Sequence, residues 1–333
     1  MDEAHAAPAG LWKRYAGHFR IGAAVNRRTL DSHARLLAEH FNSITAENEM
    51  KWGSIEPNPD DFRFEVPDRM AAFATARGIG IRGHTLVWHN QTPAWVFSGG
   101  RMELAERMRR HIQAVVGRYR GRIYCWDVVN EAVADAGGDR LRASPWLEGM
   151  GEDYIAHAFQ LAHGADPDAT LFYNDYNETD PGKRAKIHGL VGDLRREGVP
   201  VHGIGLQGHW RLDAPSARDI RASLDLYASL GVRLQVTELD VSVHAGREPA
   251  AGAAEPAPEL LERQAERYAE IFAIFREYRA VIDAVTLWGI ADDATWLDNF
   301  PVRGRKDWPL LFDTHHRPKP AFAAVARGVE PAR

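Results

Sequence analysis

The sequence predicts a single α/β domain folded as an eight-stranded (β/α)8 barrel, the TIM-barrel architecture. Short apolar, β-branched runs alternate with helical segments along 333 residues, and this alternation favours a parallel sheet. About eight such units in this length are typical of the closed barrel. The expected strands span residues 19–26, 42–45, 81–89, 124–132, 170–177, 203–210, 234–240 and 284–290. We expect the barrel over residues 19–328, an N-terminal extension over 1–18 and a C-terminal tail over 329–333.

In the first half of the chain, expected strands alternate with expected helices. The first strand ends at Asn26 and is followed by a helix over 29–40. Pro57 and Pro59 mark a loop before a helix over 68–77, since proline interrupts regular structure. After the third strand, apolar residues recur at helical spacing over 104–116, which predicts a helix with one face on the sheet.

The second half repeats the pattern. The fourth strand is an apolar run that ends in Asn130 and Glu131. Such a run predicts a strand buried on both faces. Asp180 and Pro181 start a helix, with proline in the first turn. Another helix is expected over 261–275 and a last one from Pro320. A doubly wound open sheet is the alternative, disfavoured because the sequence has no glycine-rich phosphate loop.

The amino-acid composition limits the kinds of binding partner that the chain can be expected to have. Hydrophobic residues make up 45% and charged residues 26% of the chain, and the net charge is −5. This balance does not suggest nucleic acid or an anionic membrane as a partner. No apolar run is long enough to span a bilayer. The single cysteine, Cys125, excludes an internal disulfide and a cysteine-based metal site, and its apolar neighbours indicate an inert core thiol.

The first eight residues have neither a basic start nor an apolar core, so they are not a secretory signal. The expected location is therefore the cytoplasm, or the periplasm or exterior if a signal peptide has been removed.

Two strands deliver a glutamate to their carboxyl ends. Glu131 ends the strand over 124–132, and Glu238 lies in the strand over 234–240. In a closed parallel barrel these ends meet at one face, where such folds carry their chemistry. A facing pair of carboxylates is what glycoside hydrolysis needs. Taken alone, each glutamate could equally be a surface charge.

The remaining strand ends add amides, charges and aromatic rings, a combination suited to sugar hydroxyls and ring faces. In order from about residue 19 to residue 322, the chain carries the motifs TAENEMKW at 45–52, GHTLVWH at 83–89, WDVVNEA at 126–132, NDYN at 174–177, GLQGH at 205–209, VTELD at 236–240 and WG at 288–289 with Trp296. Through this ordered set of motifs, the chain resembles the family 10 glycoside hydrolases, which are (β/α)8 endo-β-1,4-xylanases.

The resemblance implies endo-acting hydrolysis of xylan or xylo-oligosaccharides by a retaining double displacement. Glu131 matches the acid/base and Glu238 the nucleophile. His209 and Asp240 match the pair beside the nucleophile, and Asn130 the residue near the sugar 2-hydroxyl. The implied substrate-binding residues are Glu47, Asn48, Lys51, His84, Trp88, Gln91, Asn174, Tyr176, Gln207, Trp288 and Trp296.

Within that set, Tyr176 matches the leaving side, and the indoles of Trp288 and Trp296 match the glycone side. For Trp88, Trp126 and Trp288 the alternative is simple barrel packing. No cofactor and no metal are expected. His84, His89 and His209 could instead form a metal site as in amidohydrolase barrels, but Glu131 would then have no role. A barrel that only binds polysaccharide or protein is a further alternative, opposed by the presence of both glutamates. The sequence does not predict the oligomeric state.

Overall fold

The computed structural model describes residues 10–246 and 255–329. The strands are β1 (Arg20–Val25), β2 (Ser43–Ala46), β3 (Gly80–Trp88), β4 (Cys125–Asn130), β5 (Thr170–Asp175), β6 (Gly203–Leu206), β7 (His209–Arg211), β8 (Arg233–Ser242) and β9 (Ile282–Leu287). The helices are α1 (Leu11–Arg14), α2 (Thr29–Ser32), α3 (Ala34–His40), α4 (Trp52–Ile55), α5 (Glu65–Thr75), α6 (Arg101–Arg118), α7 (Pro145–Met150), α8 (Asp153–Ala165), α9 (Pro181–Arg196), α10 (Ala217–Ala228), α11 (Pro258–Glu277) and α12 (Pro320–Arg327). Two 3₁₀ turns, η1 (Ala94–Phe97) and η2 (Trp296–Asp298), complete the set.

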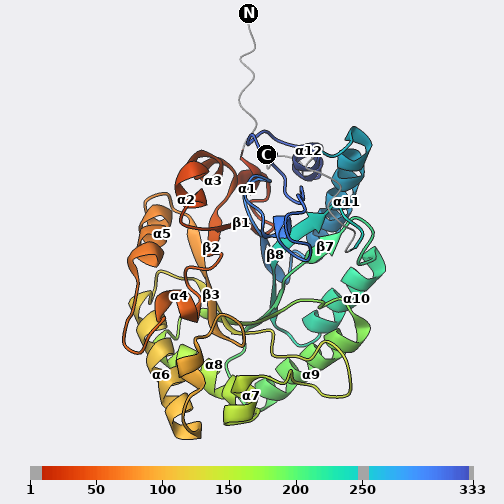
Figure 1. The fold of residues 1–333 in the computed structure, drawn as a ribbon. Helices are drawn as coiled ribbons and strands as arrows, with labels where there is room; N and C mark the ends of the chain where they lie inside the picture. Colours follow the sequence, from red (N-terminus) through yellow and green to blue (C-terminus); the bar gives the residue numbers. More distant parts are fainter. Residues whose placement is uncertain (1–9, 247–254, 330–333) are drawn as a thin grey trace, which may run out of the picture.

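Eight parallel strands close into a barrel. Neighbouring strands run in the order β6, β5, β4, β3, β2, β1, β9, β8, and pairing of β6 with β8 closes the ring. The helices lie outside the strands (Figure 1). The (β/α)8 prediction is therefore confirmed, and the carboxyl ends of all eight strands lie at one face.

Two expected elements are divided. The expected sixth strand is split into β6 and β7, because Gly208 has a φ of +78° and turns the chain between them. The short strand β7 then pairs with the outer end of β8, where His209 lies opposite Asp240. The expected helix over 29–40 is two helices, α2 and α3, interrupted at His33, whose φ of −112° is not helical.

Helix starts and packing follow local chemistry. Asp180 accepts hydrogen bonds from the backbone N–H groups of Gly182 and Lys183, so it caps α9 at the position where Pro181 begins the helix. In α6 the residues expected at the sheet-facing positions are buried, including Met108 and Ile112. Among the described residues, no helix is both long enough and apolar enough to cross a membrane.

The expected domain boundaries, at residues 18/19 and 328/329, remain predictions. Residues 1–9 of the expected extension and 330–333 of the expected tail lie outside the described residues. Within the extension, Leu11 and Tyr15 of the α1 region are fully buried, and the Tyr15 hydroxyl donates to the carbonyl of Val325 at 3.0 Å. This segment packs on the barrel.

A buried charge network joins β3 to its neighbour β4 and, across the barrel, to β8. Arg82 is fully buried, donates both terminal nitrogens to Asp127 on β4, and donates Nε to Oε1 of Gln235 on β8 at 2.9 Å. The paired carboxylate makes burial of the guanidinium tolerable. Cys125 is also buried, and burial raises the pKa of its thiol to about 12, as expected for an inert core cysteine.

Candidate active site

Glu131 sits immediately after β4, at the barrel face formed by strand carboxyl ends. Its backbone has a φ of +58°, a left-handed conformation uncommon for a residue with a side chain. Its N–H donates to the carbonyl of Asn174 at 2.9 Å, and its own carbonyl accepts from Nε of Arg142 at 3.1 Å. The residue is only 8% exposed. These bonds fix an unusual turn that directs a carboxyl into a nearly dry environment.

The surroundings of Glu131 favour its protonated form. Burial raises the pKa of this carboxyl to about 7, and the negative charges of Asp175 and Glu238 act in the same direction. Two hydrogen bonds oppose the shift because they stabilise the charged form: Gln207 donates to Oε1 at 2.8 Å and the Trp88 indole to Oε2 at 2.8 Å.

Glu238, on β8, is in the opposite state. Burial alone would raise the pKa of this carboxyl, but the hydrogen bond from His209 and the positive charges of neighbouring groups lower it to about 2. His209 Nε2 lies 3.1 Å from Oε2, and Asn174 Nδ2 donates to Oε1 at 2.9 Å. Both oxygens of Glu238 therefore have a partner that supports the ionised form.

His209 is held by a chain that runs away from Glu238. Its Nδ1 lies 2.9 Å from Oδ2 of Asp240, and the Trp296 indole donates to the same oxygen at 2.8 Å. Burial would lower the pKa of His209, but the charge of Asp240 and its hydrogen bond, together with Glu238, raise it to about 10. The imidazole is thus a cation between two carboxylates at neutral pH.

Amide side chains connect the two glutamates. Asn174 Nδ2 donates to Oδ1 of Asn130 at 2.9 Å as well as to Glu238, and Thr237 donates to Oδ1 of Asn174 at 2.7 Å. Gln207 Nε2 lies 3.5 Å from Oδ1 of Asn130 and also donates to Glu131. Asn130, Asn174 and Gln207 are all buried. This network sets the positions of the carboxyls relative to each other.

A second group of expected residues comes from the loops after β2 and β3. Lys51 Nζ donates to Oδ1 of Asn48 at 2.9 Å and lies 4.9 Å from the ring centroid of Trp88. Glu47 accepts a hydrogen bond from Asn26 at 2.9 Å. Burial lowers the pKa of Lys51, whereas the carboxylates of Glu238 and Glu47 act to raise it. A lysine ammonium thus lies within the field of both catalytic candidates.

His84 on β3 and Trp288, which directly follows β9, contact each other through their rings. His84 is buried, its Nδ1 lies 2.9 Å from Oδ2 of Asp127, and its ring meets Trp288 edge to face at 5.4 Å between centroids. Trp288 is 7% exposed. Trp126, by contrast, is fully buried, which fits the packing alternative for that residue.

Two expected residues lie at the edges of the site. Gln91 is exposed, has a φ of +50°, and accepts a hydrogen bond from the Gly53 N–H through its carbonyl at 2.8 Å. Trp296 stacks on Phe300 with 5.0 Å between ring centroids, and Phe300 is 53% exposed. Phe300 extends the aromatic surface and was missed from the sequence, because nothing in its loop distinguishes it from a packing residue.

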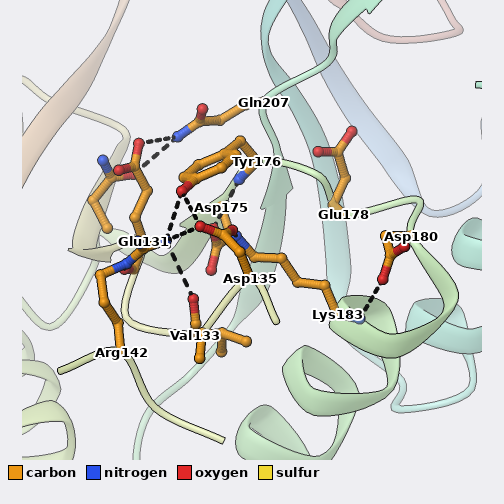
Figure 2. Close-up of polar contacts among 12 residues, drawn as sticks. Glu131, Val133, Asp135, Arg142, Asp175, Tyr176, Glu178, Asp180, Lys183 and Gln207 are labelled. Atoms are coloured by element: carbon orange, nitrogen blue, oxygen red, sulfur yellow. Dashed lines mark hydrogen bonds and ion pairs between the residues drawn. The ribbon is translucent and has the colours of Figure 1, made fainter. Parts of the chain in front are cut away.

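Tyr176 is held by a polar clamp formed by Asp135, Arg142 and Lys183 (Figure 2). Sequence reasoning missed these three residues. Its hydroxyl donates to Oδ2 of Asp135 at 2.6 Å and accepts from Nη2 of Arg142 at 2.6 Å. The ammonium of Lys183 lies 3.7 Å from the Tyr176 ring centroid and donates to Oδ1 of Asp135 at 2.6 Å. Lys183 also pairs with Asp175 at 2.8 Å.

The clamp also reaches Glu131, because Arg142 contacts both the Tyr176 hydroxyl and the Glu131 carbonyl. Burial would raise the pKa of Asp135, but the hydrogen bonds and charges of Lys183, Tyr176 and Arg142 lower it to about 2. Asp135 therefore stays ionised at all but the lowest pH. Its only signal in the sequence is the NDYN motif, which marks Tyr176 but none of its supports.

The histidines expected as an alternative metal site have other partners. His84 faces Asp127, and His209 lies between Glu238 and Asp240. For His89, burial and the charge of Arg142 lower the pKa to about 4. Chemically, the site offers one carboxyl that keeps a proton near neutral pH and one that stays ionised, the combination used by glycosidases.

Comparison with known proteins agrees with this geometry. The family profile described as glycosyl hydrolase family 10 matches residues 10–328. Endo-1,4-beta-xylanase B of Paenibacillus barcinonensis is 54% identical over 314 residues, covering 92% of this chain and 95% of that protein. An endo-1,4-beta-xylanase of Geobacillus stearothermophilus is 55% identical over 317 residues, covering 93% and 96%.

Solved structures give the same result. A xylanase from Paenibacillus barcinonensis complexed with a conduramine derivative matches with a TM-score of 0.94 at 51% identity, covering 97% of this chain and 99% of that one. A GH10 xylanase from Thermobacillus composti matches with a TM-score of 0.90 at 54% identity, covering 96% and 100%. With the barrel, the two glutamates in opposite ionisation states and these matches together, the chain belongs to glycosyl hydrolase family 10.

Proposed function

We propose that this family 10 enzyme is an endo-1,4-β-xylanase that hydrolyses internal β-1,4-xylosidic bonds of xylan or xylo-oligosaccharides with retention of configuration. The observation that carries the proposal is the opposite shift of two buried carboxyls, with the pKa of Glu131 raised to about 7 and that of Glu238 lowered to about 2. A retaining glycosidase needs a proton donor and an ionised nucleophile on either side of one bond.

In the first step the Glu238 carboxylate attacks the anomeric carbon while Glu131 transfers its proton to the leaving oxygen. The glycosidic bond breaks, and a glycosyl ester forms on Glu238. In the second step Glu131, now ionised, takes a proton from water, whose oxygen attacks the anomeric carbon and releases Glu238. His209 supports the ionised nucleophile and Asp240 supports His209, as their hydrogen bonds suggest.

The surrounding residues are proposed to hold the sugar chain. Asn130 lies within the amide network at Glu238, where it suits a contact to the 2-hydroxyl of the sugar being transferred. Tyr176, with Lys183 against its ring, suits stacking on the leaving side. The proposed glycone-side residues are Glu47, Asn48, Lys51, His84, Trp88, Gln91, Trp288 and Trp296.

The assignment is tested by two substitutions. Glu131→Ala should lose activity on xylan but keep the first step on aryl xylobiosides with good leaving groups, which need little protonation. Added azide should then yield the β-glycosyl azide. Glu238→Ala should lose activity on every substrate, and a fluoro-sugar inactivator should label Glu238 in the wild type.

The chain offers a matched control in Glu178. This glutamate is also buried, and burial raises the pKa of its carboxyl to about 7, but it accepts a hydrogen bond from Trp210 rather than from the residues around Glu131. Glu178→Gln should keep turnover on xylan. Near wild-type cleavage of xylan by Glu131→Ala, or a label mapped to another residue, would sink the assignment.

A further inference from the structure

Two histidines and an aspartate converge outside the set of residues assigned to the sugar chain. His33 Nε2 lies 2.8 Å from Oδ1 of Asp293, and His316 Nε2 lies 3.5 Å from the same oxygen. The two imidazoles lie 4.1 Å apart between centroids. One ligand atom from each of the three residues lies within 4.8 Å of the other two. Within residues 10–246 and 255–329, no other group of three such side chains comes together in this way.

The three residues come from segments far apart in the chain. His33 lies between α2 and α3 after β1, Asp293 follows β9, and His316 lies in the turn before α12. His33 is 1% exposed, whereas the side chains of Asp293 and His316 are 24% and 35% exposed. The cluster therefore has one buried ligand position and an open side through which an ion can enter. His316 has a φ of +64°, an uncommon conformation that a functional contact can explain.

The partner of the other ring nitrogen of His33 allows it to bind a metal ion. Its Nδ1 lies 2.7 Å from Oγ of Ser32, and that hydroxyl is 3.1 Å from the carbonyl of Arg28. When Ser32 donates to Arg28, its oxygen accepts Nδ1–H and leaves Nε2 of His33 with a free lone pair. In that tautomer two acceptors, Nε2 of His33 and the Asp293 carboxylate, face each other without a proton between them. A cation bound by both would remove this repulsion. A metal-bound histidine normally donates its other N–H in this manner.

The spacing is close to that of a coordination shell. Zinc binds imidazole nitrogen and carboxylate oxygen at about 2.0–2.2 Å, which places tetrahedral ligand atoms roughly 3.4 Å apart. His316 Nε2 and Asp293 Oδ1 already have such a separation, and His33 Nε2 needs to withdraw by only a fraction of an ångström. Arg28, whose Nη1 is 4.0 Å from Oδ2 of Asp293, is 63% exposed and free to turn toward solvent.

We propose that His33, Asp293 and His316 bind a divalent transition-metal ion, with zinc as the expected ion and a water in the fourth position. Two imidazoles and one carboxylate favour zinc over magnesium or calcium, which prefer oxygen ligands. The ion ties the junction of α2 and α3 to the loop after β9, which also carries Trp296, and to the turn before α12. Its role is structural, because within the described residues no hydrogen bond or ion pair joins these three residues to Glu131 or Glu238.

Chelator-treated wild-type protein, titrated with zinc chloride by calorimetry without substrate, should show a site of one-to-one stoichiometry. At free zinc well above its Kd, the Tm should rise by roughly 5 °C. Cobalt(II) in place of zinc should give the visible absorption of a tetrahedral site. Because the measurement uses no substrate, its outcome is independent of whether the enzyme cleaves xylan.

The variants His316→Asn and His315→Asn are a matched pair. His315 is the exposed neighbour of His316 and lies outside the cluster. His316→Asn should weaken zinc binding by at least about tenfold and abolish the Tm shift, while His315→Asn should behave as wild type. Asp293→Asn should also lose the site, and the Tm of each variant without zinc shows that it folds. Equal zinc binding by wild type and His316→Asn, or no binding at micromolar zinc, would overturn the proposal.

Discussion

His209 Nε2 lies 3.1 Å from Oε2 of Glu238, and this contact lowers the pKa of the carboxyl, so that Glu238 stays ionised. Burial alone would make Glu238 a weak nucleophile because it favours the protonated form. The cationic imidazole reverses that preference. Its own positive charge depends on Asp240, 2.9 Å from the opposite ring nitrogen. Asp240, which does not contact the nucleophile, therefore helps to keep it ionised through His209.

Asp240→Asn should shift the acid limb of the kcat/KM profile to higher pH. Without the Asp240 charge, burial lowers the pKa of His209 and the imidazole loses its proton. The pKa of Glu238, held at about 2 in the wild type, then rises, by about 1–3 units for the loss of a close opposite charge. Activity requires ionised Glu238, so it is lost as pH falls through this higher pKa. Profiles on an aryl xylobioside measure the shift.

Asp225→Asn is the control, because Asp225 is an exposed carboxylate that bonds only to Tyr278 among the hydrogen bonds of the described residues, and its acid limb should not move. An unchanged acid limb in Asp240→Asn would contradict the role of Asp240.

Trp88→Phe should move the basic limb of the same profile upward. Activity is lost as pH rises through the pKa of Glu131, about 7, because the acid must be protonated. The Trp88 indole donates to the charged form of Glu131, so its removal raises that pKa. Trp95→Phe makes the same chemical change where the indole donates to the Pro57 carbonyl, and should leave the limb in place. A downward shift in Trp88→Phe would show that the indole does not stabilise the carboxylate.

Asp135→Asn should impair cleavage of xylo-oligomers more than cleavage of aryl xylobiosides. Asp135 holds both the Tyr176 hydroxyl and Lys183, so its loss releases the ring expected under the leaving sugar. Hydrogen bonds to charged groups contribute about 1.5–3 kcal/mol, which corresponds to a fall of about 10- to 150-fold in kcat/KM on xylotetraose. An aryl xylobioside with a good leaving group depends little on that ring.

Glu277→Gln, which breaks an exposed ion pair with Arg221, is the control for Asp135→Asn and should change neither substrate. Equal losses on both substrates in Asp135→Asn would mean that Asp135 supports folding of the whole site rather than the leaving side.

Much of the barrel was predictable because strand burial leaves a direct trace in the sequence. Apolar runs that end in Asn130–Glu131 or contain Glu238 mark both the strand and the place of its carboxylate. The split between β6 and β7 was not predictable, since a glycine such as Gly208 is compatible with either a continuous strand or a turn. Which amide contacts which glutamate was equally hidden, because it depends on side-chain geometry across several strands.

Residues that meet only through tertiary contacts could hardly be predicted from the sequence. Lys183 lies in the first turn of α9, where a lysine is ordinarily exposed, yet its side chain is fully buried between Asp135 and Asp175. His33 and Asp293 are 260 positions apart, so no local pattern relates them. Charged groups that become buried through partners elsewhere in the chain need the fold before they can be recognised.

Gly83→Ala should destabilise the barrel. A Cβ at Gly83 on β3 would lie 2.1 Å from Cε3 of Trp126, the fully buried indole opposite it on β4. Overpacking of this kind costs about 1–3 kcal/mol or more. Gly189, in the middle of α9, has open space at the same position, so Gly189→Ala should instead stabilise by about 0.4–1 kcal/mol. Urea unfolding of both variants measures the difference, and a stable Gly83→Ala would show that the strands adjust.

Of two residues that bear on the preference for xylose over glucose, only one can be changed without disturbing the nucleophile. Gln91 and Trp296 match substrate-binding positions of the family, and we expect their side chains to occupy the space of the hydroxymethyl group that glucose carries and xylose lacks. Trp296 donates its indole N–H to Asp240, which holds His209, so Trp296→Ala would also disturb the nucleophile. Gln91 engages its neighbour Gly53 through the backbone carbonyl alone, and its side chain is exposed.

Gln91→Ser therefore removes side-chain volume while keeping that backbone contact. Pocket discrimination against so small a group is about 1–3 kcal/mol per contact, so kcat/KM on an aryl cellobioside should rise by about 5-fold or more while the rate on the xylobioside changes little. Thr92→Ser, the adjacent residue whose hydroxyl donates to the Trp88 carbonyl, keeps its hydrogen bond and is the control. Because steric exclusion is relieved only for the larger sugar, a parallel change on both substrates would assign the selectivity to other residues of the site.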